Sequence, residues 1–172
     1  LDVGVLMSLV TDSGEDAPIA YSSQADPKEF CWQVTTFANN DDSEIRVLLN
    51  HFNLDLEPLS RLSGEEFTLE AWMSPLTKIS GDWDEWTKDM KLDAWNQHKA
   101  QIDASYQAPE CLIAAIGAFV ESLEANPDVY KTVGIEDLYF INGSFLLHLK
   151  DLRLMAEWAR DRGFDKVRLL VS

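Results

Sequence analysis

The sequence predicts an α+β fold in which several amphipathic helices pack on a small mixed sheet. Short apolar runs near the two ends, residues 3–10 and 166–171, are typical of strands, whereas apolar residues recur at helical spacing through most of the chain between them. The 172 residues, 46% of them hydrophobic, show no internal repeat and no composition shift that would mark a linker. We therefore expect one compact domain spanning residues 1–172.

The first third of the chain predicts a strand, a polar loop and a helix. Residues 3–10 are apolar on both alternating faces, as expected for a central strand, and residues 19–21 predict a second short strand. The segment Asp26-Pro27-Lys28-Glu29 predicts a helix start, because Asp caps helices, Pro suits the first position and Glu stands in capping-box register. The apolar stripe of this helix is Phe30, Val34, Phe37 and Ala38.

Helices also predominate in the middle of the chain. Residues 45–52 favour a helix over a strand, and residues 67–72 fit either. Residues 82–103 predict a long acidic helix, and residues 109–125 predict the clearest amphipathic helix, which ends at a loop over residues 127–136. The apolar stripe of the amphipathic helix is Leu112, Ile116, Phe119, Val120 and Leu123.

The C-terminal part predicts a strand-helix-strand unit. Residues 138–141 have the pattern of a short buried strand, and the turn that follows ends at Ser144, whose hydroxyl suits a helix N-cap. Residues 145–162 then predict a helix, and residues 166–171 a strand. The length suits a right-handed crossover between two parallel strands. The apolar stripe of the helix is Phe145, Leu149, Leu152, Ala156 and Ala159.

The charge of the chain is strongly negative and unevenly distributed. Thirty acidic residues against fourteen basic ones give a net charge of -16, which repels the phosphates of nucleic acids and anionic membranes. Residues 1–107 hold 20 acids and 7 bases, whereas residues 108–172 hold 10 acids and 7 bases. This imbalance favours a directed acidic surface, although acidity that only maintains solubility gives a similar composition.

Targeting and redox signals favour a reducing, aqueous compartment. The sequence has no run of 18 or more apolar residues and no basic segment ahead of an apolar one. Cys31 and Cys111 lie far apart between apolar helix positions, which favours two buried thiols over a disulfide. We expect a cytoplasmic protein that binds neither membranes nor nucleic acids.

The sequence offers one candidate catalytic nucleophile, Cys31, and no common catalytic motif. The common signature motifs of nucleotide-binding proteins and hydrolases are absent from the sequence. Cys31 lies near a predicted helix start, where the helix dipole lowers a thiol pKa, so a nucleophile is one hypothesis. Its base would be His51, His98 or His148, all remote in sequence. The alternative is a thiol in the hydrophobic core.

A metal site is a second hypothesis. The acids Asp12, Glu15 and Asp16 follow the first predicted strand, and carboxylates there suit a hard cation such as Mg²⁺. A turn rich in Asp and Gly has the same composition for conformational reasons alone. The three histidines show no metal-ligand spacing, so we expect them to be structural, and we expect no metal and no cofactor.

The most unusual segment interleaves tryptophans with carboxylates between residues 82 and 95. Aromatic side chains supply contact area and carboxylates steer and orient a basic partner. The alternative is a helix that buries its tryptophans in the core and leaves its acids in solvent. The predicted partner-binding residues are Asp82, Trp83, Asp84, Glu85, Trp86, Asp89 and Asp93.

A family resemblance rests on the last third of the chain. Its residues are the amphipathic helix from Glu110 to Leu123 and the ending from Leu149-Lys150-Asp151-Leu152 through Gly163 to residues 166–171. In this organisation the chain resembles bacterial immunity proteins that neutralise toxins of polymorphic and contact-dependent systems, many of which are small acidic cytosolic α+β domains. The resemblance implies a non-catalytic inhibitor of a basic toxin domain. If that domain is a nuclease, carboxylates would occupy the place of substrate phosphates.

Three functional hypotheses therefore stand side by side. The first is the acidic binding protein, an immunity protein in the case of the family resemblance. The second is a small hydrolase that uses Cys31 as nucleophile or a metal at Asp12, Glu15 and Asp16. The third is a non-catalytic subunit whose tryptophans form a homodimer interface.

Overall fold

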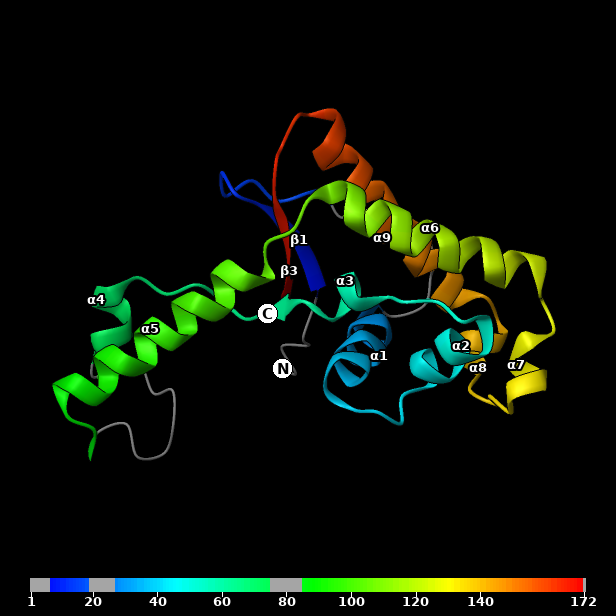
Figure 1. Ribbon diagram of the computed structural model, residues 1–172, viewed down its shortest axis with the longest axis horizontal. Coiled ribbons are helices and arrows are strands. Elements are labelled where there is room, and N and C mark those ends of the chain that lie inside the picture. Colours follow the sequence, from blue (N-terminus) through cyan, green and yellow to red (C-terminus); the bar gives the residue numbers. More distant parts are fainter. Residues whose placement is uncertain (1–6, 19–26, 75–84, 172) are drawn as a thin grey trace.

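The computed structural model describes residues 7–18, 27–74 and 85–171. Within these ranges the chain forms helices and one mixed sheet, so the predicted α+β class is confirmed (Figure 1). The predicted strand at residues 19–21 and the cap at Asp26 lie outside the described residues. In chain order the elements are β1 (Met7–Thr11), α1 (Pro27–Asn39), α2 (Glu44–Phe52), α3 (Glu57–Ser60), β2 (Leu62–Ser63), α4 (Leu69–Met73), α5 (Lys88–Ser105), α6 (Pro109–Ala125), α7 (Val129–Val133), α8 (Leu138–Ile141), α9 (Ser144–Asp161) and β3 (Val167–Val171).

The sheet is organised around β3, which is last in sequence and central in space. The described strands have the order β1-β3-β2, with β1 antiparallel and β2 parallel to β3. Leu169 is the Cα partner of Leu9 on one side and of Leu62 on the other. The prediction of a central first strand is therefore wrong for the described part of that strand, because β1 lies at an edge.

The predicted strand-helix-strand unit is wrong in its first element. Leu138–Ile141 forms the short helix α8, and Asp137 Oδ1 caps it by accepting a hydrogen bond of 2.9 Å from the Tyr139 amide. In a helical turn consecutive side chains point in different directions. Tyr139 is therefore buried, while Leu138 and Ile141 are 72% and 52% exposed. Four apolar residues in a row do not distinguish a strand from a buried helical turn.

The second half of that unit agrees with the prediction. Helix α9 begins at Ser144, one residue earlier than predicted, and its N-cap is Gly143 with a φ of 85° instead of the hydroxyl of Ser144. Gly163 follows the helix with a φ of 79°, a conformation that costs least without a Cβ. Strand β3 then forms as predicted, although both of its partners come from the first half of the chain.

The core lies where α6 packs along α9. All predicted apolar positions of these two helices are buried, and the ring of Phe145 contacts those of Phe140, Phe119 and Phe30 at centroid distances of 4.7, 5.9 and 6.0 Å. The predicted loop over residues 127–136 contains the short helix α7.

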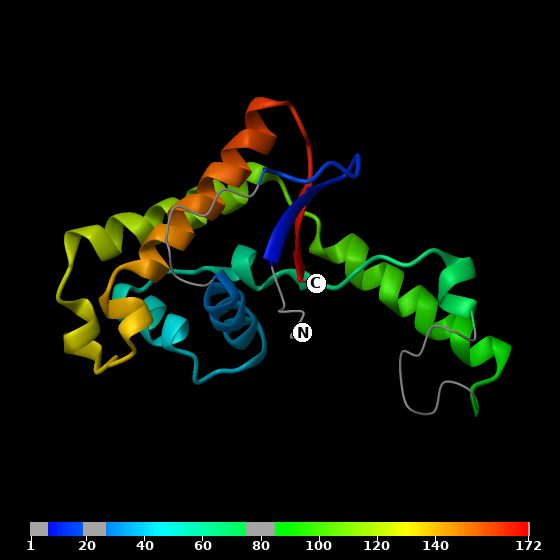
Figure 2. The same ribbon diagram turned by 180° about the vertical axis from the view of Figure 1, so that it is seen from behind.

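Two elements lie apart from this core. Figures 1 and 2 show α4 and α5 extending from the sheet on the side opposite the other helices. We call α4 and α5 the arm and the remaining elements the body. The predicted helix over residues 82–103 corresponds to α5, which begins at Lys88, and residues 82–84 lie outside the described ranges.

Candidate functional site

The arm holds itself together through one aromatic cluster. Trp72 of α4 is 4% exposed, stacks on His98 of α5 at a centroid distance of 4.8 Å, and donates from Nε1 to the Lys91 carbonyl oxygen at 3.1 Å. Phe67 adds a contact to each of these two rings, at 6.0 Å to Trp72 and 5.9 Å to His98. Helix α4 therefore covers one side of α5.

A threonine hydroxyl caps the N-terminus of each helix of the arm. Thr68 Oγ1 accepts from the Ala71 amide at 3.1 Å, and Thr87 Oγ1 accepts from the Met90 amide at 3.2 Å. Each cap satisfies an amide that has no partner within the helix. Local capping thus supports helices that gain little from the core.

Most of α5 remains uncovered. Of its 18 residues only Ile102 and Ser105 are buried. Positions three and four apart lie on one side of a helix, so one long face is exposed from end to end. We call it the acidic face, and its residues are Asp89, Asp93, Asn96, Ala100 and Asp103.

Negative charge gathers on one side of α5. All three carboxylates of the helix lie on the acidic face, and at 100° per residue Lys88 and Lys91 fall on the other half of the helix, whereas Lys99 lies at the edge of the face, four residues before Asp103. Asp89 and Asp93 stand at i and i+4, where like charges destabilise a helix by about 0.2–0.5 kcal/mol. This arrangement concentrates negative charge at a small cost to the helix itself.

Apolar side chains border the acidic face. Met90 is 46% exposed and Leu92 is 36% exposed, on opposite flanks of the face. Trp86, which precedes the helix, is half-buried. The uncovered surface therefore combines carboxylates with apolar contact area, the composition that suits a basic protein surface.

The predicted partner-binding residues fall in two groups. Asp82, Trp83 and Asp84 lie outside the described residues, and Glu85 is exposed just before α5. Both remaining predicted acids, Asp89 and Asp93, belong to the acidic face. Asp103 is not among the predicted residues, although its spacing of 14 residues from Asp89 places it on the same side of the helix.

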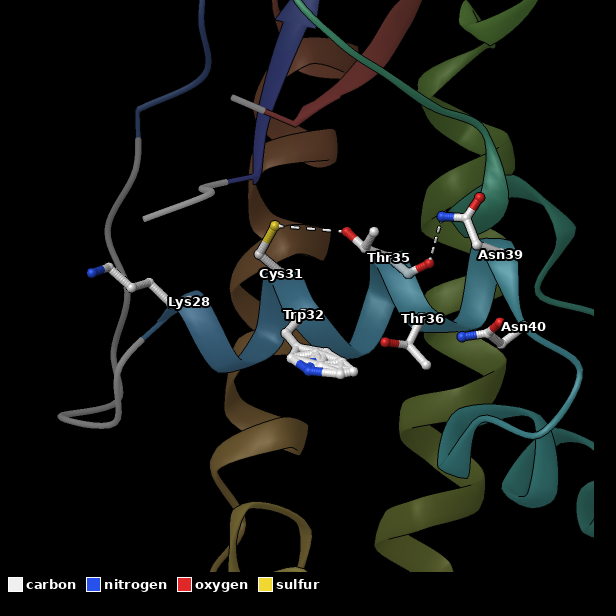
Figure 3. Close-up of a pocket in the computed structure, with 7 residues that line it drawn as sticks. All are labelled: Lys28, Cys31, Trp32, Thr35, Thr36, Asn39 and Asn40. Carbon is white, nitrogen blue, oxygen red and sulfur yellow. Dashed lines mark hydrogen bonds between the residues drawn. The ribbon is translucent and has the colours of Figure 1, made fainter. Parts of the chain in front are cut away.

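Cys31 is a buried thiol of α1, and Figure 3 shows its sulfur facing the hydroxyl of Thr35. It is 1% exposed, and burial raises the pKa of its thiol, an effect that the Sγ···Thr35 Oγ1 contact of 3.9 Å only partly offsets. A raised pKa leaves less thiolate at neutral pH, which disfavours nucleophilic catalysis. Cys111 is exposed and not buried as predicted, and both cysteines are free.

A shallow cavity of about 410 Å³ lies along α1. Figure 3 shows Cys31 and Thr35 on one side of the helix and Trp32 and Thr36 on another. The cavity is mostly apolar, and Trp32 is 53% exposed beside it. Among the described lining residues Lys28 alone carries a charge, so this surface lacks the carboxylates that distinguish the arm.

The three histidines lie on three different helices. His148 of α9 is fully buried, and its Nδ1 lies 2.6 Å from Tyr139 Oη. His98 belongs to the aromatic cluster of the arm, and His51 of α2 packs edge-on against Phe52. These contacts account for each ring as part of the local packing.

The loop after β1 is a closed turn. Thr11 Oγ1 accepts from the Glu15 amide at 3.1 Å, and the Thr11 amide donates to the Glu15 carbonyl oxygen at 2.8 Å. Gly14 takes a φ of 83° within it, and the side chains of Asp12 and Asp16 are exposed. Within the described ranges no group of three or more His, Cys, Asp and Glu side chains is arranged to hold a metal.

No family model, no curated protein and no solved structure matches this chain. In the described part of the chain, no helix is both long enough and apolar enough to cross a membrane.

Proposed function

We propose that this chain is a non-catalytic binding protein that engages a basic protein partner through the acidic face of its arm. One observation carries the proposal: all three carboxylates of α5 point away from the covered side of a helix that the body leaves exposed. A helix that carries three carboxylates on its exposed face, with Lys99 only at one edge, is matched to a positive surface.

Carboxylates and apolar side chains would contribute differently to such an interface. Carboxylates raise the association rate with a positive partner and set its orientation, an effect that salt weakens. Met90 and Leu92 supply apolar area at the flanks, where desolvation strengthens binding. The net charge of -16 extends the attraction beyond the contact itself.

The partner class that fits best is the basic domain of a bacterial toxin, which makes the chain an immunity protein. A nuclease domain carries a positive cleft that binds phosphates, and carboxylates spaced along one helix face offer that cleft a substitute. Support for this part of the proposal comes from the chain's acidity and from its resemblance in organisation to immunity proteins.

The test is a charge reversal on the acidic face, Asp89→Lys with Asp93→Lys. Wild type and variant are used as bait for the proteins of the source cell, and the captured basic protein is purified for association kinetics at low and high salt. We expect the variant to associate at least about tenfold more slowly and with a weaker dependence on salt. Circular dichroism should show an unchanged fold.

A matched control separates the arm from the overall charge. Asp41→Lys with Glu121→Lys makes the same change in net charge at two exposed positions of the body. This control should retain most of the association rate. Equal losses in the two variants, or no basic protein captured by the wild type, would reject the acidic face as the interface.

A further inference from the structure

The two ends of the arm attach to neighbouring residues of β3, Val167 and Arg168. On one side, the Gln107 amide and carbonyl exchange hydrogen bonds of 2.8 Å with those of Val167. On the other, Arg168 Nη1 donates to Ser63 Oγ at 2.7 Å and to the Gly64 carbonyl oxygen at 3.1 Å. We call Ser63-Gly64 and Tyr106-Gln107 the arm root.

Arg168 touches both halves of this root. Besides its bonds to Ser63 and Gly64, its guanidinium carbon lies 5.7 Å from the centre of the Tyr106 ring, a cation-π distance. One side chain therefore joins the segment that enters the arm to the segment that leaves it. A planar guanidinium with several donors can bridge such groups, whereas the point charge of a lysine cannot.

The placement of Arg168 is costly for stability alone. The residue is 4% exposed, its Nε has no hydrogen-bond partner, and no ion pair joins it to a carboxylate within the described residues. Burying a charge without a counter-charge is unfavourable, and apolar residues of similar volume often stabilise such positions better. A buried charge at this position is better explained by the geometry it imposes.

A cavity borders the root. It has a volume of about 310 Å³ and is lined by the β2 side of the root and by the end of α5. Its described wall comes from residues 61–64 on one side and from Gln101, Ile102, Ala104 and Ser105 on the other. Since only Ile102 and Ser105 of α5 are buried, few apolar contacts oppose a swing of the arm.

We propose that Arg168 is a positioning residue that locks the arm in one direction relative to the body. The locked arm presents the acidic face in a fixed orientation, so partner binding avoids the cost of ordering it. The effect on binding rests on the function proposed above, whereas the locking itself does not. The apparent affinity of a partner falls in proportion to the fraction of molecules whose arm points in the binding direction.

The locking is tested on the isolated protein by measuring the distance between two spin labels with double electron-electron resonance. Spin labels are placed at Gln97→Cys on α5 and Glu121→Cys on α6, both exposed positions, in a background with Cys31→Ala and Cys111→Ser. We expect one narrow distance distribution for this protein. Arg168→Met should broaden it to several distances, and Arg168→Lys should give an intermediate result because it keeps the charge and loses the bridging geometry.

Arg46→Met is the matched control for losing an arginine. Arg46 also donates to a backbone carbonyl, that of Phe37 at 3.2 Å, and its guanidinium lies 4.8 Å over the Phe37 ring, but these contacts are within the body. Its distance distribution should remain narrow. Should Arg168→Met fail to fold, Ser63→Ala with Tyr106→Leu removes the two side-chain partners of the guanidinium, while the arginine and its bond to the Gly64 carbonyl stay.

Binding to the purified basic partner gives the second readout. If the arm points in the binding direction for about a tenth of the time in Arg168→Met, the apparent affinity falls about tenfold, while Arg46→Met leaves it unchanged. A narrow distribution in Arg168→Met and in the Ser63-Tyr106 variant would overturn the locking. A broad distribution with unchanged affinity would keep the locking and reject the arm as the binding surface.

Discussion

Helices α9 and α5 have the same length, 18 residues, and opposite relations to the protein. Nine residues of α9 are buried, among them Phe145 and Leu149, whereas only Ile102 and Ser105 are buried in α5. Core packing stabilises the first helix, while a cap and the small helix α4 support the second. The difference indicates that α9 holds the fold together and that α5 is available to another molecule.

The largest expected effect lies in the body. Phe145→Ala removes a fully buried ring that contacts four aromatic neighbours, including Phe119 and Phe140, so the free energy of unfolding should fall by about 3–5 kcal/mol. Urea unfolding measures this change in the free energy of unfolding. Leu154→Ala on the same helix is the control, because that side chain is 60% exposed and its loss should change stability little. Similar losses in the two variants would contradict the assigned core.

A large but local effect is expected in the arm. Trp72→Ala removes the ring that joins α4 to α5, so amide hydrogens of the arm should exchange much faster while those of α6 and α9 stay protected. Mass spectrometry of exchanged peptides separates the two regions. Trp32→Ala, a tryptophan that is 53% exposed on the body, should leave both patterns unchanged. Faster exchange in α6 after Trp72→Ala would show that arm and body unfold together.

A matched pair of helix caps makes the comparison sharper. Ser43 Oγ accepts from the Arg46 amide at 3.1 Å in the body, and Thr87 Oγ1 makes the equivalent bond in the arm. Ser43→Ala should lower the free energy of global unfolding by about 1 kcal/mol. Thr87→Ala should instead fray the start of α5 with little global change, as seen by hydrogen exchange. The reverse result would make α5 part of the cooperative core.

The smallest effect concerns alkaline pH. Burial raises the pKa of the Cys31 thiol above its ordinary 9.0 and the pKa of the Tyr130 phenol above its ordinary 10.0. The folded protein therefore keeps these protons at pH values where the unfolded chain has lost them, so the free energy of unfolding falls as pH rises beyond 9.0.

Both titrating groups belong to the body, and residues 65–105 contain no Cys and no Tyr. Denaturant unfolding between neutral and alkaline pH should show a decline that is weaker in the variant Cys31→Ala with Tyr130→Phe. A decline of equal size in that variant would assign the effect to other groups.

The sequence predicted those elements whose stability is local or rests on a regular apolar stripe. Helices α6 and α9 have such stripes, and the residues of these stripes are buried. The prediction of a strand at Leu138–Ile141 was wrong because four consecutive apolar residues show neither helical nor strand periodicity. The cap from Asp137 instead favours a helical turn. The central place of β3 depends on pairing with strands more than 100 residues away, which no local pattern reveals.

The candidate site was predicted in part. The acids of α5 were recognisable by composition, and their common face follows from helical spacing. That α5 lies outside the body was not predictable, because the half-apolar pattern of Trp86, Met90 and Trp95 also fits a helix packed on a core. The role of Arg168 depends on contacts with Ser63 and Gly64, about 100 positions earlier in the chain.

The strand order of the sheet also determines when its strands can pair during protein synthesis. The ribosome completes β1 and β2 long before β3, and the residues between Ser63 and Val167 take about 5–20 seconds to make at ordinary elongation rates. During that interval neither early strand has its partner in β3, and the arm root lacks its bonds to Val167 and Arg168. We expect ribosome-stalled chains that end before β3 to remain protease-sensitive at the arm, since in the proposed locking Arg168 holds α5 only after β3 is made.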